Sequence, residues 1–463
     1  MSGHYDVIVL GSGGGAKIAR PAARMGLRVA LLEKEAVGGT CLNRGCIPSK
    51  MLIYPAEVRD LQKRAERYNL LDSRTGRIDF KSLIDRISTT VDGSSDHQRD
   101  AFDADAQIDF FPYAGRFVSN HEVSVNGEII TGDKIFIATG TEPSLPPIDG
   151  LADTPFMTSR EALRNTTLPQ RLIVIGAGFI AVELGYAYGA FGTEVDFVVR
   201  SRFLRGQDDD VVAEFEREFS KHHTVHKGHT PQRVEYADGL FSVHCQNAEG
   251  EAMVLQSDAL LVASGVRPMT DDLGLEHTDV ECNEAGYIRV DSHLRTHAPN
   301  VFALGDCVGN YFFRHSVNYE GEYLVRRFLR KTIETPIAYG DVPSAVFTHP
   351  QIASVGKTEQ QLRADGVDFV IGKATYADST PGMARLSDHG LVKVLADRKT
   401  HRLLGAHIVG DEASDMIHLF IAMMKKDGTI DDLLDMIFIH PSLPEVARDA
   451  VRDAGTALGI YDG

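Results

Sequence analysis

The sequence is poor in three features that would have directed its classification. It has five cysteines in 463 residues, no uninterrupted apolar run of about 18 residues, and 48 basic against 65 acidic side chains, giving a formal net charge of −17 at pH 7. The lack of long apolar runs argues against a membrane span. The acidic balance argues against nucleic acid or an anionic membrane surface as a partner. So few cysteines indicate a reducing compartment, and therefore a cytoplasmic protein.

The length and composition are those of a globular enzyme. A chain of 463 residues predicts about three domains, and 43% hydrophobic with 24% charged residues is an ordinary balance. Residues 1–4 carry no basic region followed by a long apolar run, and residues 7–10 are too short for a signal peptide. We therefore expect no targeting segment there and interpret residues 7–10 as part of a strand.

Two of the five cysteines, Cys41 and Cys46, stand close together in the segment GGTCLNRGCIPSK at residues 38–50. On a regular helix their Cα atoms would be about 7.5 Å apart along the axis, whereas a disulfide requires at most about 6.8 Å. Gly45 permits the distortion that a bridge would need, and Pro48 suits the first turn of a helix beginning near Cys46. The positive end of that helix would lower the pKa of the Cys46 thiol.

The cysteine pair has two other interpretations. In the first, the cysteines are small buried hydrophobic residues, and in the second they are zinc ligands. Zinc is disfavoured because the remaining three stand singly, at Cys245, Cys282 and Cys307. The sequence therefore predicts redox chemistry and no metal site.

A dinucleotide-binding pattern opens the chain. Residues 5–10 predict a strand, and Gly11, Gly13 and Ala16 follow as a glycine-rich turn entering a helix. Glu33 ends the next predicted strand, at the distance where an acid hydrogen-bonds the adenosine ribose. A plain flexible loop is the alternative, but the strand, helix and acid together favour a binding site.

The pattern recurs about 165 residues later. Residues 172–175 predict a strand before Gly176, Gly178 and Ala181, and two copies imply two dinucleotides. The strand that follows does not end in an acid but continues into Arg200 and, a turn later, Arg205. Guanidinium groups there would bind a 2′-phosphate, which favours NADPH over NADH. The alternative is a solvated strand end with arginines.

The segment GGTCLNRGCIPSK resembles the redox-active disulfide segment of the FAD-dependent pyridine nucleotide–disulfide oxidoreductases. Residues 134–140 and 301–306 resemble the family's second and third FAD motifs, and residues 440–445 its C-terminal His-Pro…Glu motif. The motifs occur in the family's order over nearly the whole chain. The arginines, Phe179 and the sequence HPSLPEV are most similar to the mycothione reductase branch.

The resemblance implies an α/β fold with two Rossmann-like dinucleotide-binding domains and a C-terminal α+β dimerisation domain. Its expected boundaries are residues 1–148 for the first part of the FAD domain, 149–268 for the NAD(P)H domain, 269–338 for the second FAD part and 339–463 for the interface domain. The resemblance also implies a homodimer whose active sites are shared between subunits.

The resemblance also implies roles for the reactive residues. Cys46 would contact the flavin, and Cys41 would attack the substrate disulfide. His440 of the partner subunit would protonate the leaving thiol, with Glu445 orienting the imidazole. A lone histidine is more often structural, but here it stands near a carboxylate in a chain with a redox dithiol.

Lys50 and Glu183 would pair near the flavin and the nicotinamide. The resemblance further implies two sets of cofactor contacts. Those for FAD are Gly11, Gly13, Ala16, Glu33, Lys34, Gly39, Thr40, Lys50, Thr139, Gly140, Asp306 and His315. Those for NADPH are Gly176, Gly178, Phe179, Ala181, Arg200, Arg205 and Gly265.

The predicted function is reduction of a small-thiol disulfide, mycothione-like or related, by NADPH through FAD and a Cys41–Cys46 disulfide. One alternative is an NAD-dependent dihydrolipoamide dehydrogenase. Another, of a different class, is a non-catalytic redox-sensing or complex-bound structural subunit. The absence of cysteine after Cys307 disfavours family members that need a C-terminal cysteine pair, and the presence of Cys41 disfavours soluble transhydrogenase.

Overall fold

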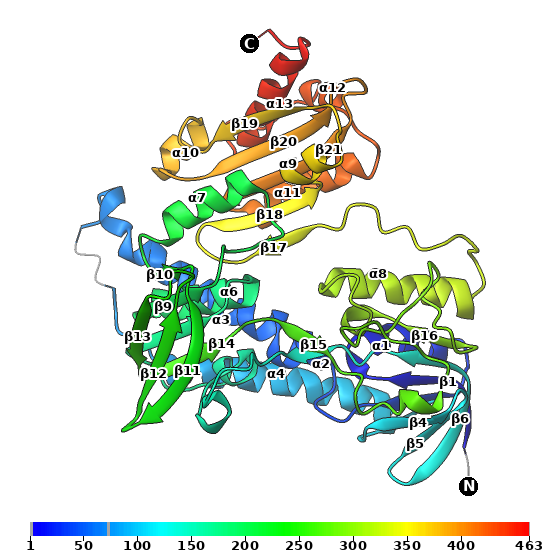
Figure 1. Cartoon of the computed structure of the whole chain (residues 1–463). Coiled ribbons are helices and arrows are strands. Elements are labelled where there is room, and N and C mark those ends of the chain that lie inside the picture. Colours follow the sequence, from blue (N-terminus) through cyan, green and yellow to red (C-terminus); the bar gives the residue numbers. More distant parts are fainter. Residues whose placement is uncertain (1–2, 72–74, 463) are drawn as a thin grey trace.

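A computed structural model of the chain describes residues 3–71 and 75–462. Its strands form sheets of seven, four, three, two and five members within that part of the chain. Figure 1 shows the seven-stranded sheet at the lower right, the four- and three-stranded sheets at the lower left, and the five-stranded sheet above them. The predicted α/β class is confirmed.

The seven-stranded sheet has a parallel core built from apolar strands. Its order is β3-β2-β1-β6-β5-β4, and the seventh strand, β16, also pairs with β6. Because helices cover a parallel sheet on both faces, its strands are apolar on both sides, as in β1. The strands are β1 (His4–Leu10), β2 (Val29–Leu32), β3 (Ile108–Phe111), β4 (Gly115–Ser119), β5 (Glu122–Val125), β6 (Glu128–Ile137) and β16 (Val301–Ala303). The chain thus leaves this sheet after β6 and returns to it at β16.

A second parallel sheet, of order β10-β9-β8-β14, carries the second glycine turn. It contains β8 (Arg171–Ile175), β9 (Glu194–Val199), β10 (Thr224–Lys227) and β14 (Ala259–Val262). Beside it lies the antiparallel sheet of β11 (Thr230–Ala237), β12 (Leu240–Gln246) and β13 (Ala252–Ser257). Helix α6 (Phe179–Phe191) is buried along most of its length, which explains why its sequence is apolar on nearly every face.

Packing between helices joins the two parallel sheets. α1 (Ser12–Arg24) follows the first glycine turn, and α2 (Gly39–Arg44) and α3 (Cys46–Lys63) carry the two cysteines. α3 packs against α6, and the 3₁₀ turn Ala65–Tyr68 and α4 (Phe80–Asp103) come next along the chain. Pro21 lies inside α1, which continues to Arg24.

The proline-rich segment at residues 142–147 begins as a strand. β7 (Thr141–Pro143) pairs antiparallel with β15 (Val266–Pro268). β7 and β15 are the two places where the chain passes from one parallel sheet to the other. They therefore lie side by side, and their backbones form hydrogen bonds with each other. This pairing joins residues far apart in sequence, so local composition did not indicate it.

The C-terminal part is a five-stranded antiparallel sheet of order β17-β18-β21-β20-β19, with helices packed against it. Its strands are β17 (Ser344–Val346), β18 (Gln351–Gly356), β19 (Phe369–Thr375), β20 (Leu391–Asp397) and β21 (Leu403–Gly410). Its helices are α9 (Glu359–Ala364), α10 (Thr380–Arg385), α11 (Ala413–Met424), α12 (Ile430–Leu434) and α13 (Pro444–Leu458). The elements not yet named are α5 (Ser159–Ala162), α7 (Asp209–Phe219), α8 (Arg314–Leu324), the π-helical turn Val325–Leu329 and the short 3₁₀ turns Leu151–Asp153, Leu275–His277 and Gly305–Cys307.

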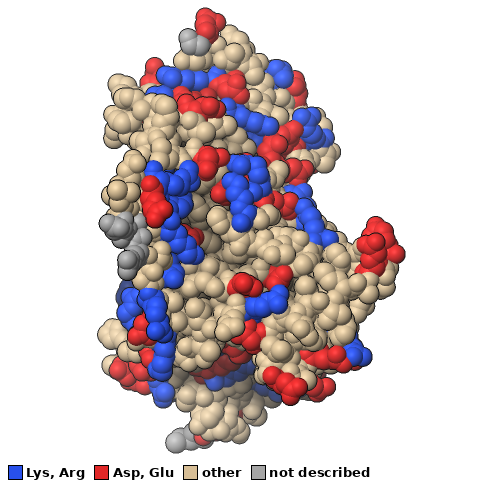
Figure 2. Space-filling model, turned by 90° about the vertical axis from the view of Figure 1, so that its left-hand side faces the viewer, with Lys and Arg blue, Asp and Glu red and all other residues tan. Residues whose placement is uncertain are grey.

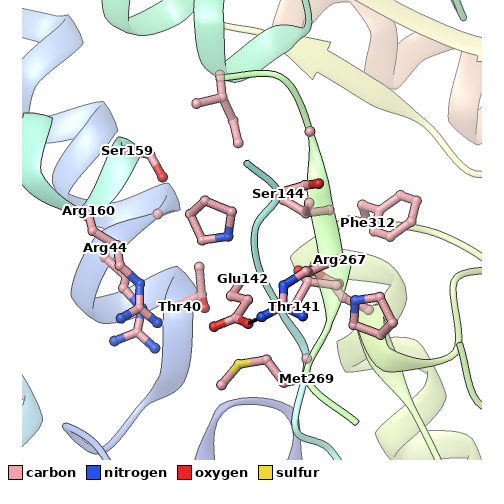
Figure 3. A pocket seen from close by; sticks show the side chains of 18 of the residues that line it. Thr40, Arg44, Thr141, Glu142, Ser144, Ser159, Arg160, Arg267, Met269 and Phe312 are labelled. Atoms are coloured by element: carbon pink, nitrogen blue, oxygen red, sulfur yellow. Dashed lines mark hydrogen bonds and ion pairs between the residues drawn. The ribbon is translucent and has the colours of Figure 1, made fainter. Parts of the chain in front are cut away.

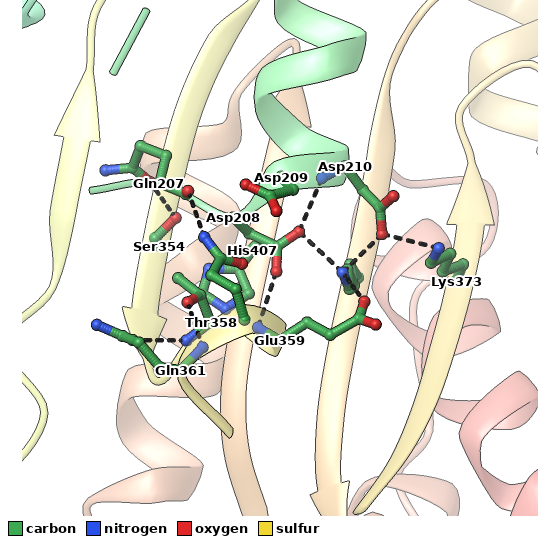
Figure 4. A network of polar contacts seen from close by, with 12 residues as sticks. Gln207, Asp208, Asp209, Asp210, Ser354, Thr358, Glu359, Gln361, Lys373 and His407 are labelled. Atoms are coloured by element: carbon green, nitrogen blue, oxygen red, sulfur yellow. Dashed lines mark hydrogen bonds and ion pairs between the residues drawn. The ribbon is translucent and has the colours of Figure 1, made fainter. Parts of the chain in front are cut away.

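A buried ionic network fastens this sheet to α7. Lys393 of β20, whose side chain is 1% exposed, donates to Asp208 at 2.8 Å, Asp210 at 2.6 Å and Glu359 at 2.5 Å. Figure 4 shows Asp208, Asp210 and Glu359 close together, with Lys373 beside Asp210. Burial opposes ionisation of both partners, but the hydrogen bonds raise the pKa of Lys393 and lower that of Asp208. Removing one partner of such a network leaves a buried charge unpaired. The network therefore fixes the position of α7 against the C-terminal sheet.

Charged side chains are mixed over the surface. On the face drawn in Figure 2, basic and acidic groups are interspersed over both the upper and the lower part of the molecule. In the part of the chain that the structure describes, no helix has the length and apolar character needed to cross a membrane.

Candidate active site

A cavity of about 1200 Å³ lies between the two parallel sheets, and both glycine turns line it. It takes in nearly all the predicted site residues of the first 310 positions, namely Gly11, Gly13, Glu33, Lys34, Gly39, Thr40, Cys41, Cys46, Lys50, Thr139, Gly140, Gly176, Gly178, Phe179, Glu183, Arg200, Arg205, Gly265 and Asp306. Ala16, Ala181, His315, His440 and Glu445 lie outside this lining. One cavity therefore brings the two predicted cofactor sites and the cysteine pair together.

The first turn has the form of a dinucleotide cradle. Gly11 has φ 98°, and a Cβ there would lie 2.4 Å from the carbonyl oxygen of Ala138, so only glycine allows this approach. Glu33 at the end of β2 accepts hydrogen bonds from the backbone N–H of Ser12 at 2.9 Å and its hydroxyl at 2.7 Å. The backbone at the start of α1 and a held carboxylate fit the adenosine half of FAD.

The second turn repeats the geometry. Gly176 has φ 148°, and a Cβ there would lie 2.3 Å from the carbonyl oxygen of Ala263. Phe179 begins α6, is 40% exposed and lines the cavity. Arg200 and Arg205 line the same cavity just after β9, and Arg205 donates to the hydroxyl of Ser201 at 3.0 Å. These groups fit a second, nicotinamide dinucleotide.

The cysteine pair lies across a break between two helices. α2 ends at Arg44, Gly45 has φ −140° and ψ −118°, and α3 begins at Cys46. This break brings together thiols that a continuous helix would separate. A Cβ at Gly45 would lie 2.8 Å from the carbonyl oxygen of Thr40, so the residue passes close to the preceding backbone.

The two thiols differ in acidity. A hydrogen bond from Cys41 lowers the pKa of Cys46 to about 7, helped by the charges of Lys50 and Arg314 and opposed by burial. The same hydrogen bond and burial raise the pKa of Cys41 above its ordinary value. Cys46 at the start of α3 is therefore the group that carries the negative charge.

Lys50 and Glu183 form an ion pair beside the thiols. The Nζ atom of Lys50 lies 2.7 Å from Oε2 of Glu183, and Oε1 of Glu183 accepts from the backbone N–H of Phe347 at 3.0 Å. Glu183 is 4% exposed, and burial raises the pKa of its carboxyl against the lowering effect of Lys50. Lys50 also lies over the ring of Phe347, 4.3 Å from its centroid. The C-terminal sheet thus supplies part of the support for this pair.

Asp306 and Arg314 complete this side of the cavity. Asp306 accepts from the hydroxyl of Thr141 at 3.1 Å, and burial raises the pKa of its carboxyl. Arg314, the first residue of α8, lines the cavity and donates to the carbonyl of Gly13 at 2.9 Å. Arg314 is a cavity residue that was not predicted from the sequence. A basic side chain directly before the selected His315 was the available signal.

His315 has a different place from the one expected. Its Nε2 lies 2.7 Å from the carbonyl oxygen of Pro343, and its ring stacks on Phe313 at a centroid distance of 5.1 Å. The helical turn that directs Arg314 to the cavity directs the next residue elsewhere. In this structure His315 therefore links α8 to the segment before β17.

Figure 3 shows the part of the cavity crossed by the paired strands β7 and β15. Glu142 and Arg267 face each other across these strands, with their charged atoms 2.6 Å apart. On the opposite side Arg44 and Arg160 both pair with Glu35. The hydrogen bonds and charges of the two arginines hold the pKa of Glu35 below its usual value, although burial opposes this. The cavity walls are therefore fixed by ion pairs.

The C-terminal histidine is oriented by a buried carboxylate. Both oxygens of Glu445 lie 3.1 Å from Nδ1 of His440, and Glu445 also accepts from the backbone N–H of Ser442 at 3.0 Å and from Arg448 at 2.7 Å. Burial opposes ionisation, but these hydrogen bonds lower the pKa of Glu445. The imidazole itself is 67% exposed. Among the residues that the structure describes, no hydrogen-bond partner is found for its Nε2, which can therefore meet another molecule.

Comparison with known proteins identifies the class of protein that this fold and site define. Residues 5–329 match the pyridine nucleotide-disulphide oxidoreductase family, and residues 342–451 match the dimerisation domain of the same family. The chain belongs to this family of flavoprotein disulfide oxidoreductases. It is therefore an enzyme that binds FAD and a pyridine nucleotide, and its dimerisation domain implies a homodimer.

Particular relatives extend over almost the whole chain. Mycothione reductase of Mycobacterium tuberculosis (strain H37Rv) is 34% identical, covering 96% of this chain and 98% of that protein. Dihydrolipoyl dehydrogenase 1 of Arabidopsis thaliana mitochondria is 31% identical, covering 100% and 91%. The HOCl-induced flavoprotein disulfide reductase RclA of Escherichia coli superposes with a TM-score of 0.87 at 29% identity, covering 96% of this chain and 99% of that chain.

Proposed function

We propose that the chain is an NADPH-dependent reductase of a small-molecule disulfide of the mycothione class. The observation that carries the cofactor choice is the pair of arginines after β9. Arg200 and Arg205 line the cavity, and neither has a carboxylate partner among the residues described. Their charge is therefore available to a 2′-phosphate, which an acid at this place would repel.

The substrate class rests on the combination of this arginine pair with the likeness to mycothione reductase. Dihydrolipoamide dehydrogenase, the alternative, is expected to use NADH. The domain boundaries at residues 148, 268 and 338 and the cytoplasmic location stay predictions. We also propose that His440 acts in the partner's active site, because it is exposed and lies outside the cavity of its own chain.

The thiol chemistry follows from the geometry of the cysteine pair. His440 of the partner subunit takes the proton of the Cys41 thiol, and the Cys41 sulfur attacks one sulfur of the substrate disulfide. The substrate S–S bond breaks, a mixed disulfide forms, and His440 returns the proton to the departing thiolate, which leaves as the first thiol. The Cys46 thiolate then attacks the Cys41 sulfur, so that the mixed disulfide breaks and the Cys41–Cys46 disulfide forms. The second product leaves as a thiolate, which takes a proton from solvent. Bound FAD supplies the electron transfer from NADPH that restores the dithiol.

Steady-state kinetics with both nucleotides tests the cofactor choice. Two charge-assisted hydrogen bonds of about 1.5–3 kcal/mol each predict a preference of roughly a hundredfold or more for NADPH, reduced by solvent exposure. Arg200→Glu should raise KM for NADPH strongly and change KM for NADH little. Arg217→Gln is the matched control, because Arg217 on α7 pairs with Glu214 outside the cavity lining.

The same assay run against mycothione, glutathione disulfide, bis-γ-glutamylcystine and lipoamide tests the substrate class. We expect mycothione or a related small disulfide to give the highest kcat/KM. Turnover of NADH as efficient as that of NADPH, together with a preference for lipoamide, would make dihydrolipoamide dehydrogenase the better interpretation.

A further inference from the structure

Three side chains with metal-ligating atoms meet at one end of the inner strands of the C-terminal sheet, outside the lining of the redox cavity. His349 directly precedes the Pro350 that leads into β18, Asp411 follows β21, and His389 lies just before β20. These strands are neighbours, and their register pairs Gln351 with Gly410 and Leu391 with Val409. The register therefore places Asp411 between the two histidines, although the three residues are far apart in sequence.

The distances suit coordination better than hydrogen bonding. The ligand atoms of His349, His389 and Asp411 all lie within 4.8 Å of one another. Nδ1 of His349 is 3.6 Å from Oδ1 of Asp411, which is too long for a hydrogen bond. It is close to the separation of about 3.3 Å between two ligands held by a tetrahedral zinc ion with bonds of about 2.0 Å. The imidazole rings are nearly perpendicular, with centroids 5.0 Å apart.

The surroundings of His389 suit a metal ligand. His389 has a side chain only 5% exposed, and its Nδ1 lies 3.1 Å from Oδ1 of Asp388. A carboxylate on one ring nitrogen orients an imidazole and leaves the other nitrogen to bind a metal.

Other charged groups reach the cluster. Glu218 of α7 forms a second set with Asp388 and His389 whose ligand atoms also lie within 4.8 Å of one another. Arg385 lies 3.8 Å from Asp411 and also 3.8 Å from Glu412, and its side chain is 44% exposed. This arginine can therefore move away from Asp411 and keep its partner Glu412.

We propose that His349, His389 and Asp411 form a binding site for a divalent transition-metal ion of the zinc class. Two imidazoles and one carboxylate are the ligands that such ions prefer, and they leave a position for water. The prediction of no metal rested on cysteine spacing alone. His349 and His389 gave no such signal in the sequence, because only the sheet brings them together.

Zinc binding to the FAD-loaded dimer tests the proposal. The parent protein carries Cys41→Ser and Cys46→Ser, which removes the dithiol as a competing zinc ligand, and it is first dialysed against a chelator. Competition with a chromophoric chelator then measures affinity and stoichiometry. We expect one zinc ion per chain and a rise in the unfolding temperature with zinc. His389→Gln and Asp411→Asn should each weaken binding by roughly tenfold or more.

Two further variants keep the test independent of folding. His401→Gln is the matched control, because His401 lies 2.7 Å from Asp431 in the same sheet domain but stands outside the cluster, and it should leave zinc affinity unchanged. Arg385→Gln should tighten zinc binding, since it removes a cation beside Asp411. A parent that binds no zinc would overturn the proposal, as would equal affinities in the parent and in folded, FAD-loaded His389→Gln.

Discussion

Cys41 and Cys46 are chemically unequal because they occupy different places in the two helices. Cys46 stands at the start of α3, accepts a hydrogen bond from the other thiol and lies near Lys50 and Arg314, so its pKa falls to about 7. Cys41 is in α2 and donates that hydrogen bond, which raises its pKa. Above about pH 7 the pair therefore holds one thiolate, Cys46, and one protonated thiol, Cys41.

This inequality predicts a pH-dependent spectrum. A thiolate against an oxidised flavin gives a long-wavelength absorbance band, which we expect in the two-electron-reduced enzyme. Because the pKa of Cys46 is lowered to about 7, the band should be present above that pH and fade as pH falls through it. Arg314→Gln should move the midpoint upward, since the arginine's charge favours the thiolate. Absorbance during a pH titration measures both effects.

Serine variants separate the two thiols. Cys46→Ser should abolish the band, whereas Cys41→Ser should keep both the band and flavin reduction by NADPH but lose disulfide turnover. A band that survives Cys46→Ser would contradict the assignment of the thiols.

Individual residues also show which features of the site a sequence pattern can predict. The helix start at Cys46 was predictable because Gly45 and Pro48 act locally. Glu183 would pass for a helix-surface acid, yet it is buried because α6 is covered on nearly all sides. Arg314 reaches the cavity from a helix that begins 268 residues after Cys46, so no local pattern indicates its effect on the thiol.

At the scale of elements, the break between α2 and α3 is the feature on which the redox pair depends. Gly45→Ala would place a Cβ 2.8 Å from the Thr40 carbonyl oxygen and 3.4 Å from the Cα of Cys41, so backbone atoms must shift. We expect the free energy of unfolding to fall by about 1–3 kcal/mol, as for other overpacked sites. Disulfide turnover should fall as well, because the shift moves one thiol relative to the other. Denaturant unfolding and the turnover assay measure these effects.

Gly93→Ala is the control for this substitution. Gly93 lies inside α4, and apart from the helix's own backbone and its chain neighbours no atom of the described residues lies within 4 Å of an added Cβ. Alanine there should therefore stabilise the helix by about 0.5–1 kcal/mol and leave turnover unchanged. Equal effects of the two substitutions would show that the break at Gly45 has no special role.

Elements with strong local patterns were predicted well, and those formed by distant pairing were not. Both glycine turns and their flanking strands and helices lie where the sequence places them. β7 was missed because its partner, β15, lies more than 120 residues away. The cluster of His349, Asp411 and His389 was not predicted for the same reason. Its residues come together only through the register of β18, β21 and β20.

At the scale of the whole molecule, the histidine proposed to protonate the leaving thiol lies outside the cavity of its own chain. His440 is oriented by Glu445 but is 67% exposed and does not line the cavity that holds Cys41 and Cys46. The matched dimerisation domain, residues 342–451, contains both His440 and Glu445. A dimer therefore offers a way for this imidazole to meet the thiols of another subunit.

Mixed dimers test this arrangement directly. His440→Gln and Cys41→Ser homodimers should each lose disulfide turnover by roughly a hundredfold or more, the contribution of a general acid or of the attacking thiol. A differentially tagged heterodimer of the two variants would contain one site with both groups intact and one with neither. We expect it to regain about half of the wild-type turnover per dimer, since one of its two symmetric sites is complete. If each histidine served its own chain, both sites of the heterodimer would lack one group and the mixed dimer would be as inactive as its parents.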